Sequence, residues 1–236
     1  MDAPATVTHD AYLEVERDGR WTAQILDLPG CFAFGRDEAG ALAALTASLP
    51  TYYAWLRSHD DYMPDVRGPW QVVPRETLNT RLVGEHEVNA FFAPDAQAVD
   101  DEELDWGLAL LGWAHEDLMR MARALPAAAL DVPPPQGGRT LRQILDHVGQ
   151  SQLWFVSRLD ASPVPTAISQ LGGETVERLD RVHNACESRL RGANEEQRAR
   201  VLDHEGERWS MRKVLRRSVQ HTREHTAEVQ RLMGGR

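Results

Sequence analysis

The sequence contains few of the features that mark secreted or membrane proteins. Its only cysteines, Cys31 and Cys186, are too few and too far apart for a disulfide framework, so we expect both to be buried as small hydrophobic residues. No apolar run approaches the roughly 20 residues that span a bilayer. The first ten residues, MDAPATVTHD, lack the basic and apolar segments of a secretory signal. We therefore predict a cytoplasmic protein with no membrane partner.

Lysine is almost absent, and acidic residues outnumber basic ones. Lys213 is the only lysine, and the net charge is −10. Residues 1–95 hold 15 acidic against 7 basic residues, whereas the remainder holds 21 against 19. A nucleic-acid-binding protein needs a basic face, because phosphate neutralisation supplies much of its affinity. Neither part of the chain has an excess of basic residues, so we predict no nucleic-acid partner.

The first part of the chain alternates apolar and polar residues over short segments, which is typical of strands. Asp18-Gly19 is a hairpin signal between two such segments, residues 12–15 and 21–25. Pro29-Gly30 marks the next turn, and residues 31–34 predict a third strand. From Asp37 the apolar period becomes about 3.6, which predicts a helix to residue 56. Residues 58–75 predict a long loop, and residues 81–92 a further strand.

The segment LPGCFAFGRDEAGALAAL in this part resembles the signature of HicB-like domains, which are known from antitoxins. The resemblance covers about residues 10–57 and implies a small α+β domain with the order β-β-β-α-β. Gly40 stands where that family usually has glutamate, and no DNA-binding segment follows. The resemblance therefore implies the fold but not an antitoxin role.

A polar break at residues 94–101 separates this predicted domain, residues 1–95, from a second one at residues 101–236. Apolar residues recur with helical spacing in the second part, which predicts helices at residues 104–125, 140–159, 174–191 and 210–233. Thr140 with Gln143 predicts a capping box, and Ser210 predicts an N-cap. Four helices with three connections predict an all-α four-helix bundle.

An internal repeat supports this interpretation. TLRQIL at residues 140–145 is similar to SMRKVL at residues 210–215, at an offset of 70 residues. The bundle is therefore predicted to consist of two helical hairpins of similar design, each with a helix, an irregular loop and a capped helix.

Three of the nine histidines, His147, His221 and His225, are candidate metal ligands. His221 and His225 lie four residues apart on one predicted helix, so their rings project from the same face. Such a pair alone is weak evidence, because short motifs recur by chance. In the repeat His147 corresponds to Arg217, which lies one turn before His221. The repeat therefore predicts that His147 and His221 lie at neighbouring heights along their two helices. For the other six we expect structural roles: His9, His59, His86, His115, His183 and His204.

Two segments, TLRQILDHVGQSQLWF and ERWSMRKVLRRSVQHTREHTAEVQRLM, resemble the DinB-like superfamily, which includes bacillithiol and mycothiol S-transferases. In that family one metal ligand comes from the second helix and two come from the last, as His-x-x-x-His after a Trp-Ser/Thr cap. His147 matches the first position, His221 and His225 match the pair, and Trp209-Ser210 matches the cap. The resemblance spans nearly all of residues 101–236. It also implies a homodimer through helix faces.

Three neutral imidazoles leave a coordination position open, which is typical of a catalytic metal site. Imidazole ligands suit Zn²⁺, Ni²⁺ or Fe²⁺, and sequence does not separate these metals. An ion there lowers the pKa of a bound water or thiol, which makes either a nucleophile at neutral pH. The resemblance implies a small-molecule substrate and transfer of sulfur from a low-molecular-weight thiol.

Further side chains are candidates for supporting such a site. Acidic groups near the histidines would orient the imidazole rings: Asp146, Glu224 and Glu228. Three tryptophans are candidates for the substrate approach, although tryptophan at helical spacing more often belongs to a core: Trp106, Trp113 and Trp154.

Three functions remain open from the sequence. The first is a divalent-metal-dependent enzyme of the thiol S-transferase or hydrolase type. The second is a non-catalytic module that binds a metal or small ligand. The third is an interaction protein whose acidic N-terminal domain recruits a partner.

Overall fold

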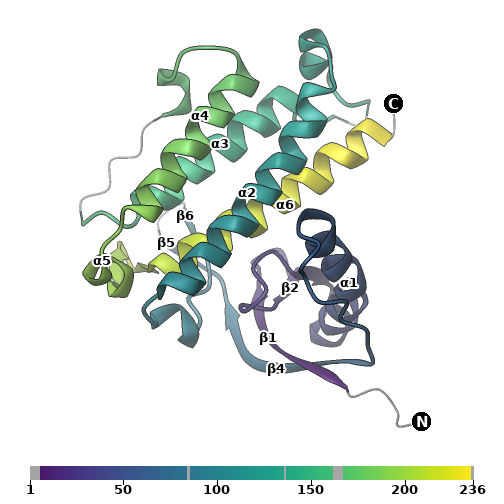
Figure 1. Ribbon diagram of the computed structural model, residues 1–236, viewed down its shortest axis with the longest axis vertical. Helices are drawn as coiled ribbons and strands as arrows, with labels where there is room; N and C mark the ends of the chain where they lie inside the picture. Colours follow the sequence, from purple (N-terminus) through teal and green to yellow (C-terminus); the bar gives the residue numbers. More distant parts are fainter. Residues whose placement is uncertain (1–5, 84–85, 136, 162–166, 235–236) are drawn as a thin grey trace. The chain divides into compact units, whose positions relative to one another are not determined.

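The computed structural model describes residues 6–83, 86–135, 137–161 and 167–234 (Figure 1). The chain divides into two compact units, residues 1–94 with 205–207, and residues 95–204 with 208–236. The first unit is rich in strands and the second is helical, as predicted. The division into domains at 1–95 and 101–236 stays a prediction, because compactness alone does not establish independent folding. Within the described ranges, no helix is both long and apolar enough to cross a membrane.

A four-stranded sheet and one helix form the first unit. The strands are β1 (Val7–Val15), β2 (Trp21–Gln24), β3 (Phe32–Gly35) and β4 (Trp70–Asn79), in the spatial order β3-β2-β1-β4. β2 pairs antiparallel with β1 and β3, whereas β4 pairs parallel with β1. Helix α1 (Glu38–His59) connects β3 to β4 and contacts β2, β3 and β4. The element order is therefore β-β-β-α-β.

The sequence motif of this unit has a clear packing role. Tyr52 of α1 is buried, and its hydroxyl donates a hydrogen bond to the Pro29 carbonyl oxygen at 2.8 Å. Gly30 adopts a φ of 84°, which a glycine tolerates without strain. A Cβ atom on Gly35 would lie 2.2 Å from the backbone nitrogen of Ala41, so only glycine lets α1 begin so close to β3. The Pro-Gly-Cys turn and the following glycine thus set the approach of helix to sheet.

The prediction for residues 58–92 is confirmed for a loop at residues 60–69 and wrong beyond it. β4 begins at Trp70 inside the predicted loop, and the predicted strand at 81–92 is instead a separate small sheet, β5 (Arg81–Val83) with β6 (His86–Val88). Among the described residues β4 is an edge strand that pairs with β1, and its positions are half-buried or exposed, which suits Pro74 and the charged residues Arg75 and Glu76. The register shifts between Ala11 and Tyr12, opposite Pro74. Proline is tolerated at an edge strand or bulge, which explains why this strand resembles a loop in sequence.

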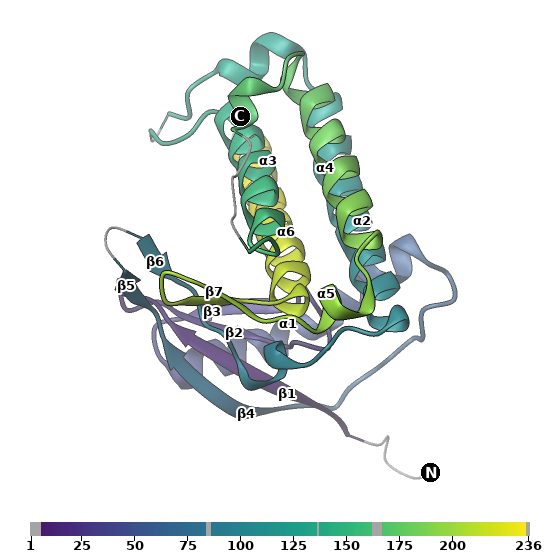
Figure 2. The same cartoon turned by 90° about the vertical axis from the view of Figure 1, so that its left-hand side faces the viewer.

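Four long helices run side by side in the second unit (Figure 2), and each was predicted to within three residues at both ends. They are α2 (Asp101–Arg123), α3 (Leu141–Ser157), α4 (Thr175–Arg191) and α6 (Met211–Gly234). Several short elements were not predicted: η1 (Ala93–Ala96), η2 (Ala127–Asp131), η3 (Ile168–Gln170), α5 (Glu195–Ala199), β7 (Leu202–His204) and β8 (Glu207–Trp209).

Side-chain caps define the helix starts. The predicted capping box of α3 is present, with Thr140 accepting from the Gln143 backbone and Gln143 accepting from the Thr140 backbone. Ser210 Oγ accepts from the Lys213 backbone nitrogen at 3.2 Å, as expected of an N-cap. α2 has a further capping box, Asp100 with Glu103, which explains why it begins earlier than predicted. Such caps satisfy backbone donors that have no partner within the helix.

The helices are not arranged as two hairpins, so this prediction is wrong. α2 packs mainly against α4 and α6, and so does α3, so the consecutive helices α2 and α3 are diagonal to one another. Contacts between helix starts, Glu103 with Arg212 and Asp146 with Arg178, show that α2 runs parallel to α6 and α3 parallel to α4. The 17 residues between α3 and α4 permit the long return that parallel neighbours require.

A buried ion pair ties the start of the second unit to α6. The Arg216 guanidinium donates two hydrogen bonds to the Asp95 carboxylate, at 2.8 and 2.6 Å. Asp95 is fully buried and Arg216 is 3% exposed. Because both charges are removed from water, each depends on the other for compensation.

A second buried pair joins α2 to α4. The rings of His115 and His183 stack in parallel with centroids 3.9 Å apart, and His115 Nε2 lies 2.9 Å from the Asp180 carboxylate. Burial lowers the pKa of both rings, to about 4 for His183. Both histidines therefore have the structural role that the sequence predicted. Both cysteines are also buried, as predicted, and burial raises the pKa of the Cys186 thiol to about 12.

Removing the carboxylate of Asp95 should destabilise the bundle strongly. We expect Asp95→Ala to lower the free energy of unfolding by about 3–5 kcal/mol, because the Arg216 charge stays buried. The exposed pair Asp105 with Arg191 offers a control, for which Asp105→Ala should cost less than about 1 kcal/mol. Urea denaturation followed by helical circular dichroism measures both. Equal losses in the two variants would contradict the account.

The stacked histidines should make the bundle acid-sensitive. An unfolded histidine has a pKa of about 6.5, so between there and pH 4 the unfolded chain binds more protons than the folded one, and stability falls as pH falls. His183 alone contributes up to about 3 kcal/mol to this loss. In metal-free protein, His115→Gln with His183→Gln should therefore flatten the decline in urea midpoint between pH 7 and 4.5. An unchanged decline would show that the pair is not responsible.

Candidate metal centre

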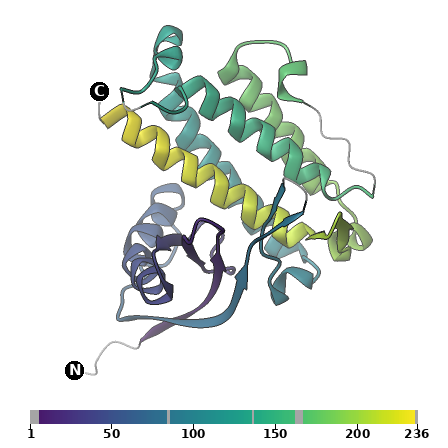
Figure 3. The same ribbon diagram turned by 180° about the vertical axis from the view of Figure 1, so that it is seen from behind.

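The candidate ligands lie on α3 and α6, which run antiparallel and side by side (Figure 3). Their facing residues include Gln152 and Thr222, joined by a buried hydrogen bond of 3.3 Å. His147 lies near the middle of α3, and His221 and His225 lie on either side of the middle of α6. The antiparallel arrangement therefore brings residues 74 positions apart in the sequence to the same height.

The three imidazoles converge through the same ring atom. His221 Nε2 lies 3.1 Å from His147 Nε2 and 3.2 Å from His225 Nε2. Among the described residues, these three form the one group of metal-binding side chains whose ligand atoms all lie within 4.8 Å of one another. His225 is buried, whereas His147 and His221 are half-buried, so the cluster is partly accessible to solvent. The predicted convergence of the three histidines is thus present.

The surroundings of the cluster favour neutral rings. Burial lowers the pKa of His147 to about 4, with further lowering from the charge of Arg139 and from His225. The pKa of His221 lies well below its ordinary value, because of burial and then the neighbouring His225 and Arg217. At neutral pH both rings therefore keep a lone pair that a cation can accept.

These distances fit a transition-metal ion. Imidazole nitrogens bind zinc at about 2.0–2.1 Å, which places two ligand atoms roughly 2.9–3.4 Å apart for angles from square to tetrahedral. The observed separations of 3.1 and 3.2 Å fall within that range. Three neutral nitrogen ligands also suit the chemistry of Zn²⁺, Ni²⁺ and Fe²⁺. The residues present thus fit the metal that the sequence pattern predicts.

One of the three proposed supporting acids contacts a histidine ring. Glu228 Oε2 lies 2.6 Å from His225 Nδ1, on the side of the ring opposite the cluster. This contact makes Nδ1 the protonated nitrogen and leaves Nε2 free to bind a metal. Asp146 instead pairs with Arg178 on α4, and its role beside the histidines stays a prediction. Glu224 is half-buried beside His225, and its role stays a prediction.

An aromatic wall, formed by Trp154, Phe155 and Trp209, flanks the cluster. The Phe155 ring lies edge-on to His221 at 5.7 Å and packs against Trp209 at 5.8 Å. Trp154 contacts both of the other rings. The wall gives His221 an apolar neighbour, which is consistent with the lowered pKa of that ring.

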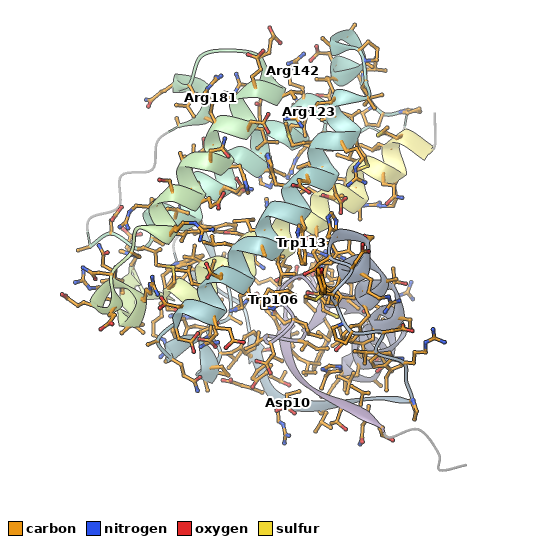
Figure 4. The ribbon with its side chains drawn as sticks, in the orientation of Figure 1. Asp10, Trp106, Trp113, Arg123, Arg142 and Arg181 are labelled. Atoms are coloured by element: carbon orange, nitrogen blue, oxygen red, sulfur yellow. The ribbon has the colours of Figure 1, made fainter. Side chains whose placement is uncertain are left out.

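The other two tryptophans suggested for the approach lie elsewhere. Trp106 and Trp113 pack edge to face with ring centroids 5.8 Å apart on α2, a helix that carries none of the three histidines (Figure 4). Sequence reasoning did not single out Phe155 or Arg217, although both sit within the quoted motif segments. The available signal was helical spacing: Arg217 precedes His221 by four residues and Phe155 follows His147 by eight, so each lies on the same helix face as a candidate ligand.

Comparison with solved structures finds a fold of limited similarity. YfiT from Bacillus subtilis, described as a probable metal-dependent hydrolase with an unusual four-helix bundle topology, is 22% identical. The similarity covers 58% of this chain and 90% of that one, with a TM-score of 0.46. At this level it carries no functional conclusion for this chain. Comparison with curated proteins finds no match.

The family comparison is more extensive. The family model of the DinB superfamily matches residues 110–229. That segment covers half of the chain and contains all three clustered histidines together with Glu228. The resemblance seen in the sequence motifs is confirmed for this part, whereas the HicB-like domain stays a prediction. The chain belongs to the DinB superfamily.

Proposed function

We propose that this protein is a divalent-metal-dependent enzyme of the thiol S-transferase or hydrolase type, with His147, His221 and His225 as the metal ligands. The proposal is carried by the convergence of the three imidazoles, in which His221 Nε2 lies 3.1 Å from His147 Nε2 and 3.2 Å from His225 Nε2. Membership of the DinB superfamily supports it. Zn²⁺, Ni²⁺ and Fe²⁺ all suit this ligand set.

The bound ion would supply an open position at which a water or a low-molecular-weight thiol loses its proton near neutral pH. The side chains of the chain prepare that position. Burial keeps His147 and His221 unprotonated, and Glu228 fixes the ring of His225 through its Nδ1. The aromatic wall covers one side of the cluster, which limits competition from bulk water.

We also propose a role for the first unit, a location in the cell and an oligomeric state. We propose a HicB-like domain at residues 1–95, supported by the Pro-Gly-Cys motif and the β-β-β-α-β order. Its excess of acidic residues suits recruitment of a basic protein partner. A cytoplasmic location and a homodimer through helix faces complete the proposal.

The metal content of the purified protein tests the ligand assignment. We expect one equivalent of a transition metal in the parent and none in the triple variant His147→Ala, His221→Ala, His225→Ala, as measured by elemental analysis. The variant His115→Gln with His183→Gln removes a histidine pair elsewhere in the bundle and should keep its metal. Equal metal in the parent and the triple variant, or none in a reconstituted parent, would refute the assignment.

A measurement of catalytic turnover then distinguishes an enzyme from a non-catalytic metal-binding module. The metal-loaded parent is assayed with low-molecular-weight thiols plus electrophiles, and with ester and amide substrates. Activity that is lost in the triple variant supports an enzyme. A metal-loaded protein that turns over none of these substrates favours the non-catalytic alternative.

Glu228 should contribute to metal affinity without being a ligand. We expect Glu228→Gln to weaken metal binding by about 10- to 100-fold, because the ring of His225 loses its charged partner. Competition with a chromogenic chelator measures the change, and Glu102→Gln at an exposed site on α2 provides the control. Unaltered affinity in Glu228→Gln would show that the contact has no part in binding.

A further inference from the structure

Positive charge lies beside the three-histidine cluster. Arg217 precedes His221 by one turn of α6, and its guanidinium carbon lies 5.9 Å from the centre of the Phe155 ring. That ring is in turn 5.7 Å from the ring of His221. Because Arg217 and His221 lie four residues apart on α6, their side chains project from the same face of the helix.

A cationic side chain lies over each ring of the aromatic wall. Besides Arg217 on Phe155, the Arg158 guanidinium lies 4.8 Å from the Trp154 ring, and Lys213 Nζ lies 4.1 Å from the Trp209 ring. Lys213 is fully buried and donates to the Arg208 carbonyl oxygen, so it is held within the structure. Of these three cations Arg217 is the nearest in sequence to a candidate ligand; it is half-buried and donates to Gln220 Oε1 at 3.5 Å. It is therefore the one of the three best placed to meet a ligand at the cluster.

The charge balance of the loaded site favours an anion. A divalent ion on three neutral imidazoles would keep its two positive charges, and Arg217 adds one more. Glu228 supplies one negative charge, and its carboxylate already contacts His225. An anionic ligand would reduce this excess, and the field of the site would also attract it from solution. Guanidinium groups in particular bind carboxylates through paired hydrogen bonds.

We propose that the substrate of this site is a small organic anion that presents a thiolate or oxygen to the metal and a carboxylate to Arg217. The inference rests on the proposed function, because it assumes that the three histidines hold a metal. Arg217 is then a specificity-determining residue, which selects the charged compound over a neutral one of similar size.

Two small thiols test the proposal by calorimetry on zinc-loaded full-length protein. 3-Mercaptopropionate carries a carboxylate, and 2-mercaptoethanol is a neutral thiol of similar size. We expect the parent to bind 3-mercaptopropionate at least tenfold more tightly. Arg217→Gln should reduce that preference to less than about twofold, a loss of roughly 1 kcal/mol or more. Arg217→Lys should retain part of it, because charge remains but the paired hydrogen bonds do not.

Two controls separate Arg217 from other causes. Arg120→Gln removes the same charge from an exposed position on α2 and should keep the preference of the parent. Chelation of zinc by both ends of 3-mercaptopropionate would persist in Arg217→Gln, so a preference that survives in this variant overturns the proposal.

The remaining outcomes are also decisive. Equal affinity of the parent for both thiols overturns the anion proposal alone, provided that the protein holds one equivalent of zinc. Failure of the parent to bind zinc overturns the proposed function and this inference together. Loss of zinc in Arg217→Gln would assign Arg217 to the integrity of the site and overturn its role in selectivity.

Discussion

The antiparallel packing of α3 against α6 is the constraint on which the candidate metal centre depends. It sets the height of His147 against His221 and His225, and it places Phe155 of α3 against His221. A shift of one helix by a single turn, about 5.4 Å, would separate rings whose nitrogens now lie 3.1 Å apart. The Gln152–Thr222 hydrogen bond and the surrounding apolar core oppose such a shift.

Burial of histidine has two different consequences in this bundle. Between α2 and α4, His115 and His183 stack, and their lone pairs lie in two nearly parallel ring planes that do not meet at the site. Such a pair cannot direct two nitrogens at one ion. Between α3 and α6 the rings are inclined at 57–88° to one another and direct their Nε2 atoms to one point. Ring orientation, rather than burial or proximity, therefore distinguishes the candidate ligands from the structural pair.

Much of the helical unit was predictable, because its signals are local. Thr140 with Gln143 fixed the start of one helix, and the apolar spacing fixed the extent of all four. The three candidate ligands could be proposed because His221 and His225 share one helix and the motif around His147 is specific. The sequence offered three acidic residues that could support a histidine ring and did not distinguish Glu228 among them. The contact of Glu228 with His225 depends on the side-chain conformation of Glu228, which the sequence does not specify.

The failures have a shared physical origin in non-local contacts. The repeat suggested two hairpins, yet sequence similarity between halves does not specify which helices become neighbours. Strand β4 was not predicted because it forms its hydrogen bonds with β1, which lies more than 60 residues earlier in the chain. The aromatic wall combines Phe155 and Trp209, which come together only in the packed bundle. Pattern and propensity describe segments, whereas these features arise between segments.

Anomalous diffraction at the absorption edge of the bound metal tests the central claim most directly, because it locates the ion without relying on affinity or turnover. The account predicts one strong peak about 2.0–2.2 Å from the Nε2 atoms of His147, His221 and His225. It also predicts that His225 Nδ1 keeps its contact with Glu228. A peak bound elsewhere, or none at the cluster in a protein that contains one equivalent of metal, would contradict the account.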